Sequence, residues 1–132
     1  MITKEQHIDF WMNTAEEDWT TVGVLFAMDR YLHCLFWAHL MLEKLAKAIW
    51  VKKHDGNEMP PAVNRIVQLL EESGVDLGQD KMEFLASFNE FQLSNQNPDF
   101  MNYVYKVCKS EFTSQELNKV QEVRTSLLKM LP

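Results

Sequence analysis

Glycine and proline are scarce in this chain of 132 residues, which contains 4 of each. Between Ile2 and His54 there is no proline and a single glycine, Gly23. Proteins rich in β-structure need frequent turns, and turns draw heavily on Gly and Pro. The scarcity therefore disfavours a β architecture and favours long helices.

Cysteine, positive charge and long apolar runs are also limited. Cys34 and Cys108 are not spaced with His or with each other as zinc ligands are, so we expect free thiols and no metal site. No Gly-rich phosphate loop occurs, and we expect no cofactor. No run reaches the roughly 18 apolar residues of a membrane span, and the N-terminal segment lacks the apolar core of a signal peptide, which predicts a cytoplasmic protein.

The net charge of −6 disfavours one class of partner. Nonspecific binding to nucleic acid or to an anionic membrane depends on an excess of Lys and Arg. We therefore expect neither.

The residues that are abundant point to helices. With 46 % hydrophobic content, the chain predicts one globular domain spanning residues 1–132. Capping boxes are predicted where Thr3 precedes Gln6 and where Thr113 precedes Glu116, and Gly74 is placed to end a helix in a left-handed conformation. Apolar residues recur at helical spacing in six segments, at about 3–25, 31–54, 61–73, 80–93, 100–109 and 113–131.

Short links between these segments place consecutive helices next to each other in opposite directions. The sequence therefore predicts an all-α protein, an antiparallel up-and-down bundle of four to six helices.

The segment at 31–54 is apolar nearly all the way round. One stripe, from Cys34 to Ile49, is expected to face the core, whereas a second set of large side chains lies on the far side. Such a helix either lies at the centre of the bundle or docks its far side on another chain. We favour a homodimer, because Trp and Phe anchor the centres of interfaces. The predicted interface residues are Phe36, Trp37 and Leu40.

Three segments in a fixed order carry a family resemblance: "AEEDW" from Ala15, "DRYLHCLFWAHLMLEKLAKAI" from Asp29 and "PPAVNRIVQLL" from Pro60. This order resembles the HEPN family, the domain named for higher eukaryotes and prokaryotes nucleotide binding. The resemblance implies a bundle of four or five helices, frequently dimeric and often encoded beside a nucleotidyltransferase. It also implies activities that range from nucleotide binding to metal-independent RNA cleavage.

One departure from the family bears on catalysis. Cleaving members carry an Arg followed, after four to six residues, by a His, so that the imidazole moves the 2′-hydroxyl proton while the guanidinium holds the phosphate. Here His33 follows Arg30 too closely and His39 follows it too distantly.

Two candidate sites follow from the second helix. His39 and Glu43 are spaced as two metal ligands would be, but one His and one carboxylate are too few for a metal centre, and a salt-bridge ladder of Glu43 with Lys47 is favoured. Lys44, Lys47 and Arg65, with His39 and Glu43 beside them, are the candidates for binding a nucleotide or phosphate. The alternative is that the lysines serve solubility and the helix dipole.

These observations lead to two hypotheses of function. The first is a non-catalytic binding or regulatory module, homodimeric, that binds a nucleotide or partners a nucleotidyltransferase. The alternative is a metal-independent RNase toxin of a toxin–antitoxin pair, with Arg30 and His33 as a nonstandard catalytic pair.

Overall fold

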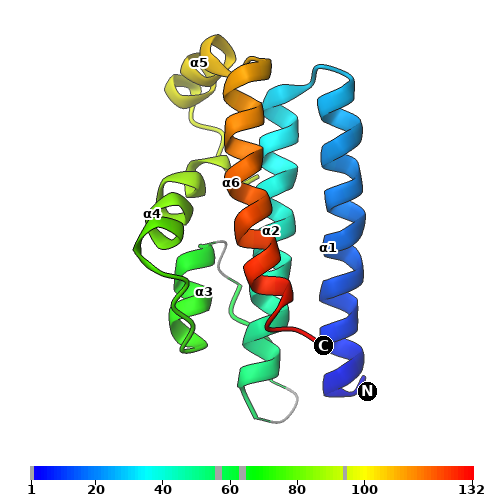
Figure 1. The fold of residues 1–132 in the computed structure, drawn as a ribbon. Helices are drawn as coiled ribbons and strands as arrows, with labels where there is room; N and C mark the ends of the chain where they lie inside the picture. Colours follow the sequence, from blue (N-terminus) through cyan, green and yellow to red (C-terminus); the bar gives the residue numbers. More distant parts are fainter. Residues whose placement is uncertain (1, 56–57, 63–64, 94) are drawn as a thin grey trace.

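A computed structural model describes residues 2–55, 58–62, 65–93 and 95–132 (Figure 1). Within these ranges there is no strand, and the all-α prediction is confirmed. The helices are α1 (Lys4–Ala27), α2 (Tyr31–Lys53), α3 (Ile66–Glu72), α4 (Gln79–Phe88), the 3-10 turn η1 (Asn89–Phe91), α5 (Pro98–Val107) and α6 (Ser110–Leu128). No helix in the described part of the chain is long and apolar enough to cross a membrane.

Four of the helices alternate in direction along the chain, and α3 breaks the pattern. In Figure 1, α1 runs up, α2 returns, α3 continues downward, α4 runs up and α6 runs down beside α2. Because α3 and α4 are antiparallel, Arg65 at the start of α3 lies near Asn89 at the end of α4. The starts of α2 and α6 lie side by side, with Tyr31 near Ser110. Their ends meet where Lys52 Nζ donates to the carbonyl of Met130 at 2.6 Å. The predicted helical bundle is confirmed, but consecutive helices are not antiparallel throughout. The third run, residues 66–91, consists of α3, which runs down like α2, and of α4 with η1, which run up.

The central helix of this bundle is α2, which contacts α1, α3, η1 and α6. Of the two arrangements that an all-round apolar helix allows, the structure therefore shows burial within one chain. Phe36 is only 5 % exposed and packs edge-on against Phe91 of η1, with the ring centroids 6.2 Å apart. The prediction that Phe36 faces a second copy is thereby corrected, since the chain's own third run covers it. Trp37 and Leu40 are half-buried, and their interface role stays a prediction.

One of the two predicted capping boxes is confirmed and the other is wrong. Thr3 Oγ1 accepts from the N–H of Gln6 at 3.1 Å, and Gln6 Oε1 accepts from the N–H of Thr3 at 2.9 Å. Thr113, in contrast, lies inside α6 and is fully buried, because α6 begins at Ser110. The extra turn packs Phe112 against the core, and burying an aromatic ring contributes about 2 kcal/mol, more than the roughly 1 kcal/mol of a cap.

The third run also differs in detail from the sequence prediction. Its first helix begins at Ile66 and not directly after Pro61, while Val63 lies outside the described residues. Gly74 follows α3 with a φ of +70°, as predicted for a left-handed cap. The segment predicted as one helix over 80–93 is α4 followed by η1.

Candidate functional site

The polar side chains predicted on α2 form a largely buried row with a carboxylate of α1. We call Asp18, His39, Glu43, Lys44 and Lys47 the polar row. Lys44 Nζ lies 2.8 Å from Asp18 Oδ2, and Lys47 Nζ lies 3.2 Å from Glu43 Oε2. Each lysine of the row is therefore neutralised by a carboxylate of the same chain.

Helix geometry and antiparallel packing together create the row. Glu43 and Lys47 are one turn apart on α2, with the acid nearer the N-terminus, which is the favourable order. The ammonium of Lys47 also lies over the ring of Trp11 in α1, 5.2 Å from its centroid. Burial raises the pKa of Glu43, and the charges of Lys47 and Lys44 counteract that rise only in part. The Glu43–Lys47 pair thus compensates a buried acid within α2, while the Lys44–Asp18 pair and the contact of Lys47 with Trp11 join α2 to α1.

His39 is sealed inside the bundle. It is 1 % exposed, its ring lies 5.9 Å from that of Phe88, and burial lowers the pKa of the imidazole to about 4. Its Nδ1 lies 3.8 Å from Glu43 Oε1. The Asn89 side chain raises the pKa of His39, but this effect is smaller than the lowering caused by burial. A neutral imidazole with no route to solvent does not exchange protons with a substrate.

Arg65 belongs to another part of the molecule. It is exposed just before α3 and lines a small cavity of about 70 Å³ with Val67, Leu85, Ala86 and Asn89, whereas Lys44 and Lys47 contact α1. The structure therefore divides the predicted phosphate-binding set into an ion-paired group on α2 and a separate arginine.

The predicted alternative pair, Arg30 and His33, lies at the corner between α1 and α2. Both residues are exposed and line a pocket of about 160 Å³, to which α5 contributes Tyr105. The corner is held by Tyr31, whose hydroxyl donates to Asp29 Oδ1 at 2.8 Å, and Asp29 adopts a φ of +59°. Such a conformation is uncommon for a residue with a side chain. Sequence reasoning missed Tyr105, since only the fold brings α5 to this corner.

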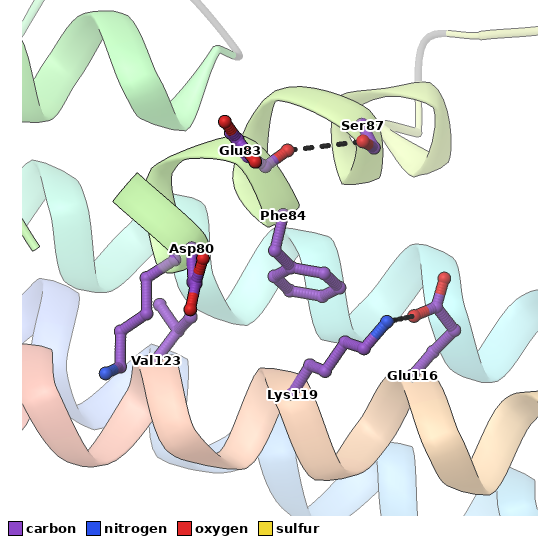
Figure 2. Close-up of a pocket in the computed structure, with 8 residues that line it drawn as sticks. Asp80, Glu83, Phe84, Ser87, Glu116, Lys119 and Val123 are labelled. Atoms are coloured by element: carbon purple, nitrogen blue, oxygen red, sulfur yellow. Dashed lines mark hydrogen bonds and ion pairs between the residues drawn. The ribbon is translucent and has the colours of Figure 1, made fainter. Parts of the chain in front are cut away.

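A larger groove lies between α4 and α6 and has a volume of about 460 Å³ (Figure 2). Phe84 of α4 points down toward α6, where Lys119 Nζ lies 5.8 Å from the ring centroid and 3.7 Å from Glu116 Oε2. Asp80, Lys81, Glu83, Ser87 and Val123 complete the lining. The groove has both signs of charge, so it offers no field of one sign to an ionic ligand. Its residues come from two distant segments without a motif, and sequence reasoning missed it.

The thiols and the acidic residues gather no metal-binding set. Cys34 is buried, Cys108 is half-buried and neither is in a disulfide. Burial raises the pKa of Cys34 to about 12 and that of Cys108 to about 11, which keeps both as unreactive thiols. Among the described residues, no three His, Cys, Asp or Glu side chains come together as ligands, and the pair of His39 with Glu43 gains no third member.

Comparison with known proteins places the chain in a family. The crystal structure of TT1696 from Thermus thermophilus superimposes with a TM-score of 0.76 over 94 % of this chain and 98 % of that chain, at 14 % sequence identity. At that identity the similarity shows a shared fold. No curated protein matches the sequence. The family model of the HEPN domain matches residues 8–130, and we conclude that the chain belongs to the HEPN domain family.

Proposed function

We propose that this HEPN-family chain is a non-catalytic binding or regulatory module that works as a homodimer. The single observation that supports the non-catalytic part of this proposal is that the side chains of the polar row are paired or buried within the chain. Lys44 is paired with Asp18, Lys47 with Glu43, and His39 is 1 % exposed. A general acid or base has to come within hydrogen-bond distance of its substrate, and His39 has no such access.

RNA cleavage tests the non-catalytic part of the proposal directly. We expect single-stranded RNA to stay intact when incubated with excess purified protein and EDTA, because the family spacing of Arg and His is absent. Metal-independent cleavage that persists through successive purification steps would contradict the proposal.

The ligand or partner under this proposal is a nucleotide or a nucleotidyltransferase. Arg65 is the candidate cation that no carboxylate of the described chain neutralises within 4 Å. A ligand at 100 times its dissociation constant adds about 2.7 kcal/mol to the free energy of unfolding, so ATP or GTP binding is detectable as a rise in melting temperature. We expect Arg65→Ala to abolish that rise and Arg30→Ala, at another exposed site, to preserve it.

A second candidate function is a metal-independent RNase toxin of a toxin–antitoxin pair. It is favoured by one observation, namely that Arg30 and His33 line the same pocket beside Tyr105. In this mechanism His33 accepts the proton of a 2′-hydroxyl, Arg30 holds the phosphate, and Tyr105 offers a ring against which a base stacks.

Two histidine variants test this second candidate. His33→Ala would abolish cleavage, whereas His54→Ala, whose ring stacks on Trp50 outside the pocket, would leave it unchanged. Intact RNA with the unaltered protein removes the candidate.

A further inference from the structure

The C-terminal part of α1, from Trp19 onward, has no charge. The segment Trp19–Met28, "WTTVGVLFAM", contains no charged residue in a chain that is 24 % charged. Its exposed residues form what we call the α1 face: Thr20, Gly23, Val24, Ala27 and Met28. Val24 is 53 % exposed and Met28 is 64 % exposed. The solvent side of a surface helix is usually polar and charged, so this face has the composition of a covered surface.

The threonine hydroxyls of this segment donate within α1. The hydroxyl of Thr20 donates to the carbonyl of Glu16 at 3.1 Å, and that of Thr21 donates to the carbonyl of Glu17 at 3.1 Å. Both hydroxyl donors are thus satisfied inside α1. A neighbour can cover this half of the helix without leaving a buried hydroxyl donor unpaired.

A groove runs beside the α1 face. It has a volume of about 350 Å³ and lies between α1 and α6, with walls formed by Trp19, Val22, Gly23 and Phe26 and by Leu117, Asn118 and Gln121. Its lining is apolar apart from two uncharged amides. Glu16 and Arg124, which join the two helices beside Trp19, are paired with each other. The groove therefore presents no unpaired charge from this ion pair to an apolar occupant.

Gly23 lies in the wall of this groove, and no contact within the described chain requires a glycine there. It is in the interior of α1, where glycine is a poor helix former. No atom of the described chain lies within 4 Å of a Cβ built on it, apart from its neighbours and its own helix, so no packing requires its small size. Glycine permits another backbone to approach closely. Gly23 thus indicates close contact with a helix from outside the chain.

We propose that a second copy of this chain packs its α1 across the α1 face, with the two helices crossing at Gly23. Val24 and Met28 of each copy then lie against the groove of the other. Val24 and Met28 form an apolar ridge that lies beside the groove on the same surface. A two-fold axis therefore places the ridge of each copy against the groove of the other. A net charge of −6 makes most surfaces repel a second copy, and this uncharged face avoids that repulsion. The inference rests on the proposed homodimer and assigns its contact surface to the α1 face instead of to Trp37 and Leu40.

Light scattering at tens of micromolar on four proteins, the unaltered protein, Val24→Glu, Phe10→Glu and Trp37→Glu, locates the surface. The unaltered protein is expected at twice the mass of the 15.5 kDa chain. Val24→Glu is expected at the mass of one chain, because it places a carboxylate in the contact. Phe10→Glu is the matched control, since Phe10 has the same 53 % exposure on the same helix but lies outside the α1 face, and it is expected to remain a dimer.

The alternative results separate this inference from the proposed function. A dimer that survives Val24→Glu and dissociates with Trp37→Glu overturns the α1 face but keeps the homodimer. A dimer that dissociates equally with Phe10→Glu also overturns the assigned surface. A monomeric unaltered protein overturns both the surface and the homodimer.

Oxidative cross-linking gives a test that does not depend on the folding of a charged variant. In a Cys108→Ser background, where Cys34 is buried, Gly23→Cys is expected to form a disulfide between two copies, because a crossing at residue 23 brings the two Cα atoms within the 4.4–6.8 Å or so that a disulfide spans. Asn13→Cys, exposed on the same helix, is the control and is expected to stay uncross-linked. No cross-link at position 23 would overturn the proposed crossing.

Discussion

Among single residues, His39 couples the fold to pH. Burial holds its pKa at about 4 in the folded chain, against 6.5 in the unfolded chain. Between these values the unfolded state binds more protons, so the free energy of unfolding falls as pH is lowered from 6.5 to about 4. The loss amounts to about 3 kcal/mol. Burial raises the pKa of Glu43, which acts in the opposite direction and makes the net change smaller.

A variant isolates the contribution of His39. His39→Gln removes the titrating ring and leaves Glu43, Lys44 and Lys47 in place. We expect urea unfolding at pH 7 and pH 5 to show a smaller decrease for this variant than for the unaltered protein. His33→Gln, at an exposed position, is the control and is expected to keep the full decrease. Equal pH dependence in all three proteins would show that His39 does not titrate as its burial predicts.

Thr113 has a buried hydroxyl without a hydrogen-bond partner in the described chain. Removing an unsatisfied buried hydroxyl while keeping the shape of the side chain is neutral or stabilising. We expect Thr113→Val to raise the free energy of unfolding by about 0 to 1 kcal/mol, as measured by thermal or urea unfolding. Ser73→Ala is the comparison, since Ser73 Oγ donates to the carbonyl of Leu69 at 2.8 Å, and it is expected to lose about 1 kcal/mol. A loss in Thr113→Val as large as that in Ser73→Ala would mean that the Thr113 hydroxyl is satisfied.

At the scale of helices, two glycines with different backbone conformations should respond oppositely to alanine. Gly23 is inside α1 with open space at its Cβ position, so Gly23→Ala should raise the free energy of unfolding of the monomer by about 1 kcal/mol. Gly74 has a φ of +70° after α3, and Gly74→Ala should lower it by about 1 kcal/mol. Urea unfolding at low protein concentration measures both. Destabilisation by Gly23→Ala would mean that the position is more crowded than its geometry indicates.

Capping patterns in the sequence predicted helix ends correctly only where no burial of apolar side chains nearby extended the helix. Thr3 and Gly74 act as predicted because each has only the local backbone to satisfy. Thr113 has the same spacing to a following acid but lies inside α6, because the burial of Phe112 extends that helix backwards. A capping pattern does not report how much apolar surface lies upstream of it.

The same limit explains the error about α2. Its apolar residues on all sides correctly predicted that both sides are buried, but periodicity alone does not say which chain provides the cover. Phe91 of η1 covers Phe36, and η1 lies in a segment that the sequence described only as the end of a helix. The exposed apolar surface is the α1 face, and the sequence predicted most of this segment only as the end of a helix over about 3–25.

For the whole molecule, the bundle and its family could be predicted because helical periodicity and the order of the family segments extend through much of the chain. The membership is shown by the match over residues 8–130. The pocket of Arg30 with Tyr105 and the groove of Phe84 with Lys119 could not be predicted, since each joins segments that only the tertiary fold brings together.

The same distinction applies to the candidate site. Sequence spacing correctly paired Glu43 with Lys47 on one helix, but the pairing of Lys44 with Asp18 depends on the antiparallel contact of α1 with α2. That contact pairs Lys44 with a carboxylate of α1, and Lys47 is paired within α2, so each lysine already has an ion-pair partner in the chain. The binding experiment with ATP and GTP therefore targets Arg65 and not these two lysines.

We infer that Glu43 and Lys47 of α2 stabilise the bundle through their ion pair and do not serve a substrate. A double-mutant cycle of Glu43→Gln and Lys47→Met, followed by urea unfolding at pH 7, tests this claim most directly. We predict that Lys47→Met alone costs about 3 kcal/mol, since it leaves a buried carboxylate without its nearest ammonium, and that the two changes are coupled by about 1 to 2 kcal/mol. Single changes that leave stability unaltered and show no coupling would contradict the claim.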